Sequence, residues 1–141
     1  VYGARGQNFP KTMLRLAQER AELRVIHDQV GAPTGAELLA DVTAHALRAV
    51  QAQPALAGTY HVAAAGETSW HGLAGFAIHT AMALRPDLPW RVEHIEPIPT
   101  TDYPTPARRP LNSRLDTARL QAAFGLQMPP WKHGVRRMLT E

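Results

Sequence analysis

The sequence contains no cysteine among its 141 residues. Disulfide bonds, thiolate metal ligands and cysteine nucleophiles are therefore excluded, and a reducing compartment is the simplest expectation. There is no run of about 18 apolar residues that could span a membrane, and no charged and apolar leader ending in small residues. From these absences we expect a cytoplasmic protein that has no membrane partner.

The excess of positive over negative charge is also small. The net charge is +3, and the 45% hydrophobic and 19% charged composition is that of a soluble globular protein. The length suits one domain with a single core. The compact basic groups are limited to Arg108–Arg109 and Lys132–Arg137, with little aromatic interleaving for base stacking. Nucleic-acid binding is therefore not expected.

Hydrophobic periodicity predicts that strands and helices alternate along the chain. Helices are expected over residues 8–20, from Ala36 to about Gln51, from about Ser69 to Leu84, over Asn112–Phe124 and over Trp131–Glu141. Strands are expected over Leu23–Ile26, Gly58–Ala64 and Arg91–Ile95, with the end of another strand at Val1–Gly6. This order predicts an α/β fold with helices packed on a mixed or parallel sheet. Because strands this short and few lack neighbours on both sides, we expect another structural part to complete the sheet.

Two helices are expected to bury one face each. The helix from Ala36 has apolar residues at helical spacing, namely Leu38, Leu39, Val42, Ala46, Leu47 and Val50. The next helix is expected to bury Trp70, Leu73, Phe76, Ala77 and Met82. Seven of the 12 prolines lie between Pro86 and Pro110. Since proline fixes φ and removes a donor, this segment is expected to be extended and tied to a framework.

The residues by themselves predict no catalytic centre. No G-x-G-x-x-G loop is present, and none of the seven histidines forms the i, i+4 pair typical of a helical metal site. Ser69 and Ser113 lack the G-x-S-x-G context of a hydrolase nucleophile. The neighbours His27 and Asp28 are an acid–base candidate at neutral pH, with ordinary surface placement as the alternative.

One irregular loop stands out as a candidate contact region. The stretch DQVGAPTG, over Asp28–Gly35, is followed by Glu37 and offers carboxylate, amide and hydroxyl groups between two regular elements. Ligand and partner contacts tend to lie on such loops. A loop that only turns the chain is the alternative.

Four stretches together resemble the dTDP-4-dehydrorhamnose reductases of the extended short-chain dehydrogenase/reductase superfamily. They are VYG with NFPKTMLRLAQER, then VIHDQVGAPTGAELLAD, then YHVAAAGETSWHGLA, and finally PIPTTDYPTPARRPLNSRLDTARLQAAFG. The second contains the D-Q-x-G-x-P-T block and the fourth the R-P-x-N-S-x-L block. The resemblance covers essentially all 141 residues in order.

The resemblance implies a Rossmann-type reductase of dTDP-rhamnose biosynthesis, a pathway that supplies cell-surface polysaccharides. The reaction would reduce dTDP-4-dehydro-L-rhamnose with NADPH or NADH, using a Tyr-x-x-x-Lys pair. The three tyrosines here are Tyr2, Tyr60 and Tyr103, and no lysine stands four residues after any of them. Residues 1–141 are therefore expected to be the carboxy-terminal substrate-binding part, with the amino-terminal cofactor-binding part absent. This fragment is expected to be inactive alone.

The resemblance also implies site residues. Val1, Tyr2 and Gly3 would border the sugar-nucleotide pocket. Glu37 and Glu141 match glutamates that hold Mg²⁺ near a dimer interface in the family, so a homodimer is expected as well as a partnership with the amino-terminal half. Two other hypotheses remain open. The chain is a non-catalytic dimerisation or binding module, or it belongs to another sugar-nucleotide reductase, epimerase or dehydratase.

Overall fold

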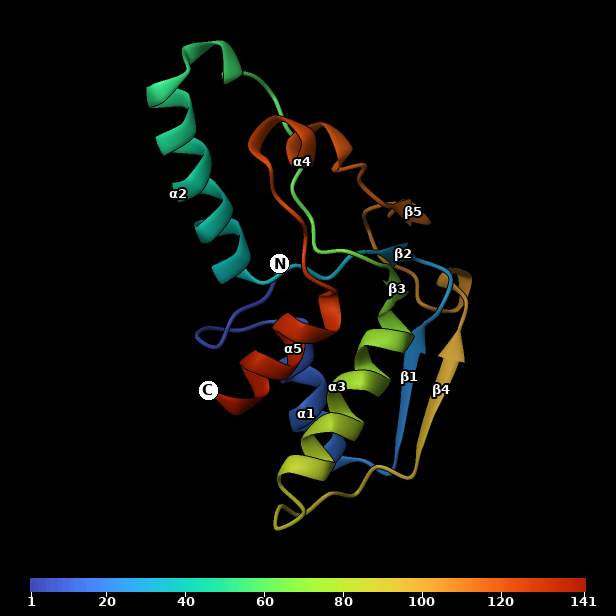
Figure 1. Ribbon diagram of the computed structural model, residues 1–141. Coiled ribbons are helices and arrows are strands. Elements are labelled where there is room, and N and C mark those ends of the chain that lie inside the picture. The colour runs from blue at the N-terminus through green and yellow to red at the C-terminus, as the bar shows by residue number, and fades with distance from the viewer.

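The computed structural model describes residues 1–141 and shows an α/β architecture (Figure 1). The helices are α1 (Phe9–Glu19), α2 (Ala36–Ala52), α3 (Trp70–Leu84), α4 (Ala118–Phe124) and α5 (Trp131–Thr140), with short 3-10 turns η1 (Pro54–Leu56) and η2 (Thr100–Asp102). The strands are β1 (Glu22–Ile26), β2 (Val30–Gly31), β3 (Thr68–Ser69), β4 (His94–Ile98) and β5 (Asn112–Ser113). They form two small sheets, a parallel β1–β4 pair and a three-stranded sheet in the order β3–β2–β5.

The β1–β4 pair is covered on one face by α1 and α3 (Figure 1). Successive strand residues point to opposite faces, so Leu23 and Val25 are buried against the helices. Between them, Arg24 points away and forms an ion pair with Glu96 of β4, at 2.9 Å. The alternation in β1 therefore separates an apolar core from a polar outer face.

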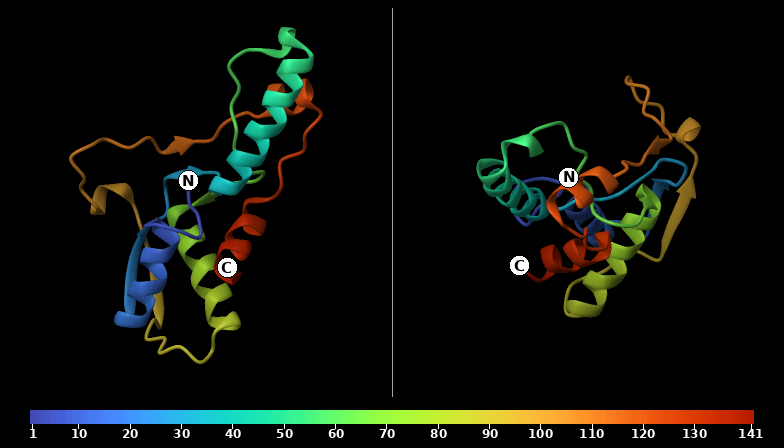
Figure 2. Two further views of the ribbon diagram at one scale, coloured as in Figure 1. Left: turned by 90° about the vertical axis from the view of Figure 1, so that its left-hand side faces the viewer. Right: turned by 45° about the horizontal axis from the view of Figure 1, so that its top comes forward.

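A second part of the molecule stands apart from this core. Figures 1 and 2 show α2, η1 and α4 in a lobe that projects away from α1, α3 and α5. We call α2, η1 and α4, with the segments that join them, the α2–α4 lobe. Its buried cluster consists of Val42, Leu120, Phe124 and Met128. The Tyr60 ring packs edge-to-face on Phe124, with ring centroids 5.0 Å apart. The lobe thus has an apolar centre of its own.

Several predicted elements are confirmed, including the first helix with Asn8 as its N-cap and the glycine stop after α4. Gly125 ends α4 at φ 62°, in the left-handed region that favours glycine. Ser69 caps α3 by accepting a hydrogen bond from the Gly72 amide at 3.1 Å. No helix combines the length and apolar character needed to cross a membrane.

The predicted strand over Gly58–Ala64 is wrong. The segment has no neighbouring strand and forms no ladder, and its end is held by a side chain and by one isolated bridge just beyond it. The Ala64 amide donates to the Thr34 hydroxyl at 3.1 Å, and Ala65 bridges to Pro130.

Two other boundaries are also wrong. The strand expected at Arg91–Ile95 lies at His94–Ile98 and includes Pro97, which an edge strand tolerates because one side of it needs no donors. The helix expected from Asn112 begins at Ala118, where the Asp116 carboxylate accepts a hydrogen bond from the Ala118 amide at 2.8 Å.

The expected buried faces need correction at two positions. Trp70 is 42% exposed, and Leu47 of α2 is 60% exposed. The predicted burial of Leu73 and Ala77 is confirmed, and the buried residues of α3 are Leu73, Ala74, Ala77, Ile78 and Ala81. Trp70 is the first residue of α3, so its side chain lies beyond the packed part of the helix.

Tyr2 connects the start of the chain to α2 and α5. Its amide donates to the Thr34 carbonyl at 3.1 Å, and its carbonyl accepts from the Ala36 amide at 2.8 Å. The ring is buried among α3 and α5 residues, and the hydroxyl donates to the Trp131 carbonyl at 3.4 Å. Gly134 makes this close approach possible, because a Cβ at position 134 would collide with the Tyr2 hydroxyl.

We therefore expect Gly134→Ala to lower the free energy of unfolding by about 1 to 3 kcal/mol, the usual cost of overpacking. The matched control is Gly75→Ala in α3, where an added Cβ meets no atom within 4 Å. That change should raise the free energy of unfolding by roughly 0.5 to 1 kcal/mol, since alanine favours a helix. Urea unfolding followed by circular dichroism would compare them. Equal stability of the two variants would contradict the packing role of Gly134.

Candidate functional site

A cavity of about 720 Å³ lies at the carboxyl end of β1, beside the small three-stranded sheet. Its wall is made by the first residues of the chain, the start of α1, the β1–β2 connection, the start of α3 and the proline-rich segment. The lining residues are Val1, Tyr2, Phe9, Pro10, Ile26, Gln29, Val30, Gly31, Ala32, Pro33, Thr68, Ser69, Trp70, Leu73, Tyr103, Thr105, Arg109, Pro110 and Ser113. In α/β proteins, ligands bind outside the carboxyl ends of the parallel strands.

The small sheet brings these distant segments together. Val30 pairs with Ser69 on one side and with Asn112 on the other. Gly31 pairs with Thr68 on one side and with Ser113 on the other. The irregular loop singled out in the sequence therefore forms the middle of the cavity wall, between the start of α3 and the end of the proline-rich segment.

A chain of hydrogen bonds joins Asp28, Thr100, Gln29 and Trp70. The Trp70 indole N–H donates to Gln29 Oε1 at 3.1 Å, and Gln29 Nε2 donates to the Thr100 hydroxyl at 3.1 Å. The Thr100 hydroxyl donates to Asp28 Oδ1 at 2.6 Å. The hydroxyl and then the amide of Thr100 lower the pKa of Asp28, because both stabilise its carboxylate form.

The cavity also offers aromatic faces and one cation. Trp70 packs edge-to-face on Phe9, with centroids 4.7 Å apart, and Tyr103 is 54% exposed. Arg109 belongs to none of the structure's ion pairs. The Glu67 carboxylate, in contrast, is engaged by Arg114, whose Nη2 donates to Glu67 Oε1 at 2.9 Å. A cavity with planar apolar walls and an unpaired guanidinium suits a planar anionic ligand.

The residues predicted to border a pocket are placed differently from one another. Val1 and Tyr2 line the cavity, whereas Gly3 does not. The Tyr2 hydroxyl is turned toward the Trp131 carbonyl, so it holds α5 in place. In the His27–Asp28 pair, the Asp28 carboxylate accepts hydrogen bonds from the amide and hydroxyl of Thr100.

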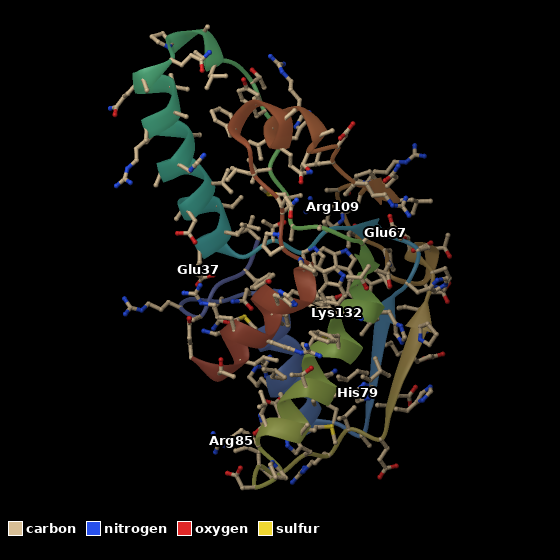
Figure 3. All side chains as sticks on the ribbon, viewed as in Figure 1. Glu37, Glu67, His79, Arg85, Arg109 and Lys132 are labelled. Atoms are coloured by element: carbon tan, nitrogen blue, oxygen red, sulfur yellow. The ribbon has the colours of Figure 1, made fainter.

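The predicted metal ligands do not form a site within one chain. No group of three or more histidine, cysteine, aspartate or glutamate side chains could hold a metal ion. Glu141 accepts a hydrogen bond from Arg137 at 2.8 Å, and Glu37 lies at the start of α2 (Figure 3). Both carboxylates raise the pKa of Arg137, with Glu141 contributing more. A guanidinium therefore already offsets their charge.

Sequence reasoning missed three side chains of this region: Thr100, Tyr103 and Arg109. All three lie in the proline-rich segment Pro86–Pro110, which was expected only to be extended, and nothing in its pattern shows where it returns to the cavity. The exposure of Trp70 could have been predicted from its position. A residue in the first turn after an N-cap often lies beyond the packed face of a helix.

Comparisons with known proteins give a consistent picture. The family model described as RmlD substrate binding domain matches residues 1–141. A dTDP-4-dehydrorhamnose reductase from Shigella flexneri is 54% identical over 141 residues, covering 100% of this chain and 46% of the relative. One from Burkholderia thailandensis is 47% identical over 139 residues, covering 96% of this chain and 47% of the relative. The chain thus spans about half the length of the curated relatives it matches.

Solved structures are similar over the same extent. A dTDP-4-dehydrorhamnose reductase from Bacillus anthracis in complex with NADP has a TM-score of 0.77 and 34% identity, covering 99% of this chain and 44% of that structure. One from Clostridium acetobutylicum has a TM-score of 0.80 and 31% identity, covering 96% and 44%.

The buried phenol of Tyr2 gives a pH-dependent expectation. Burial first, and the negative charge of Glu37 second, raise the pKa of Tyr2 from 10.0 to about 12. The folded state therefore favours the protonated phenol. The stability that this preference contributes is fully present below the unfolded value near 10.0 and is lost as the pH rises through about 12.

We expect an alkaline absorbance titration of the chain, compared with Tyr2→Phe, to show that the Tyr2 phenolate forms only near pH 12. Its formation should coincide with loss of the near-ultraviolet circular dichroism of the folded state. A Tyr2 phenolate that forms near pH 10.0 in the folded protein would contradict the burial of this hydroxyl.

Proposed function

Because the chain belongs to the RmlD substrate binding domain family, we propose that it is the substrate-binding part of a dTDP-4-dehydrorhamnose reductase. The match over residues 1–141 is the observation that carries the proposal. The parent enzyme would reduce dTDP-4-dehydro-L-rhamnose to dTDP-L-rhamnose. A cytoplasmic location belongs to the same proposal, and the absence of cysteine supports it.

The cavity has the chemistry that a sugar nucleotide needs. Trp70 and Tyr103 offer exposed aromatic faces for a planar base, and Arg109 offers an unpaired guanidinium for the diphosphate. Val1 and Tyr2 line the same cavity, which supports the proposal that the start of the chain borders the pocket. Gly3, next to them, would act through the backbone turn that leads to α1.

The reducing chemistry is assigned to a part outside these residues. A reduced nicotinamide cofactor would supply the hydride, and the solved relative in complex with NADP supports NADPH in this role. Residues 1–141 contain neither a glycine fingerprint nor a tyrosine followed four positions later by lysine. The contribution of this chain is to bind the substrate, orient it and exclude water from it.

The sheet supports a division into two parts. β1 and β4 pair only with each other, so each strand has one free edge. Parallel strands are usually found inside larger sheets with both faces covered. We propose that a strand from the amino-terminal cofactor-binding part pairs with the free edge of β1, and that residues 1–141 are the carboxy-terminal part of the enzyme.

A homodimer with Mg²⁺ at its interface is a further element of the proposal. One chain offers Glu37 and Glu141, and Mg²⁺ requires more oxygen ligands than these two carboxylates supply within one chain. A site shared by two copies, or completed by the amino-terminal half, would supply further oxygen ligands.

The first test is to measure dTDP binding to the 141-residue chain by isothermal titration calorimetry, and NADPH oxidation with dTDP-4-dehydrorhamnose. We expect binding without turnover. Arg109→Gln should weaken dTDP binding about tenfold or more, since a charge-assisted hydrogen bond to phosphate is lost. Arg108→Gln is the matched control, because Arg108 does not line the cavity. Equal losses in the two variants, or turnover by this chain alone, would contradict the assignment.

The second test concerns the shared metal. We expect Mg²⁺ to increase the dimer fraction measured by light scattering, and both EDTA and Glu37→Gln to decrease it. Glu22→Gln serves as the control, since Glu22 is exposed on β1 and forms no ion pair. A dimer fraction that EDTA does not change would rule out a metal-dependent interface.

A further inference from the structure

We propose that Thr100 is a positioning residue that, through Gln29, fixes the Trp70 indole on the cavity wall and thereby sets the affinity for the nucleotide. We call Trp70, Gln29, Thr100 and Asp28 the Trp70 relay. The binding role rests on the proposed function, whereas the positioning of Trp70 stands on the structure alone.

The hydrogen bonds of the Trp70 relay can run in only one direction, with each donor on the Trp70 side and each acceptor on the Asp28 side. The indole N–H of Trp70 can only donate, and the ionised carboxylate of Asp28 can only accept. Between them, Gln29 accepts with Oε1 and donates with Nε2, and the Thr100 hydroxyl accepts from Gln29 and donates to Asp28. Each donor and acceptor has one assignment, so the amide of Gln29 and the hydroxyl of Thr100 are fixed in orientation.

Asp28 anchors the far end of the relay. Its carboxylate accepts from the Thr100 hydroxyl at 2.6 Å and from the Thr100 amide at 3.0 and 3.1 Å. The two hydrogen bonds from the Thr100 amide are sufficient to attach η2 to the end of β1. The hydrogen bond from Gln29 to the Thr100 hydroxyl is therefore not needed for that attachment. This bond instead orients the Gln29 amide that accepts from Trp70.

Trp70 is an unusual residue to hold so firmly, because its side chain is 42% exposed. Its N–H is bonded to Gln29, and its ring packs edge-to-face on Phe9 at 4.7 Å. An exposed aromatic side chain usually keeps rotamer freedom, which a ligand must remove on binding. Fixing the indole beforehand lowers this entropic cost, as expected for a surface that contacts a ligand.

The matched variants are Thr100→Val and Thr101→Val. The Thr101 hydroxyl bonds only to Asp102, at 3.3 Å, and has no link to the relay. Thr100→Ser keeps the hydroxyl and should restore the parent behaviour. Gln29→Met removes both bonds of Gln29 but leaves the Asp28–Thr100 anchor, which provides a second route to the same question if Thr100→Val does not fold.

The first readout is the indole N–H signal of Trp70 in a nitrogen–proton correlation spectrum of the 141-residue chain, assigned with Trp70→Phe. Thr100→Val and Gln29→Met should shift this signal and accelerate its exchange with water about threefold to tenfold, as expected for a weakened hydrogen bond. Thr101→Val and Thr100→Ser should leave it unchanged. An unchanged signal in both Thr100→Val and Gln29→Met would overturn the positioning role.

The second readout is the affinity for dTDP. Thr100→Val and Gln29→Met should weaken it about threefold to tenfold, while the two control variants keep the parent affinity. A shifted indole signal with unchanged dTDP affinity would overturn the binding role. If the parent chain itself fails to bind dTDP, the proposed function fails and the binding role fails with it, whereas the indole signal still decides whether Thr100 positions Trp70.

Discussion

The burial of one tyrosine ring determines how the parts of this molecule are joined. Tyr2 is 5% exposed, and its backbone bonds to the segment that leads into α2 while its hydroxyl reaches α5. Residues at opposite ends of the sequence therefore meet in one cluster with α3. The cavity wall depends on this contact, because Tyr2 and the residue before it form part of that wall.

The two small sheets form the cavity by bringing distant segments of the chain together. The parallel β1–β4 pair sets the direction in which the chain leaves the core, and β2 then pairs with both β3 and β5. Each pairing in the second sheet involves only two residues a side. Such short ladders contribute little stability, so hydrogen bonds from side chains, such as that from Thr100 to Asp28, share in holding the wall together.

Local patterns in the sequence predicted much of the fold. The caps at Asn8 and Ser69 and the glycine stop at Gly125 act within a few residues, so they can be recognised without the rest of the structure. The element boundaries that were wrong depend on distant partners. The segment 58–64 lacks a neighbouring strand, and β4 takes its register from β1.

The site was less predictable for the same reason. The loop at Asp28–Gly35 was identified from its composition, but its link to Thr100 crosses about 70 residues of sequence. The place of Arg109 on the cavity wall depends on how the proline-rich segment returns to the β1–β2 connection, which no spacing rule contains. Family resemblance supplied the reductase hypothesis, whereas the cavity wall became visible only in three dimensions.

The separate apolar cluster of the α2–α4 lobe has a consequence for cooperativity. Leu38 packs against both this cluster and the one around Tyr2. It is the partly buried hydrophobic residue that the two clusters share. Regions with few shared buried contacts open independently and at lower free energy than the global unfolding. We therefore expect the lobe to open as a separate foldon, with its amides exchanging with solvent while the β1, α1 and α3 core stays closed.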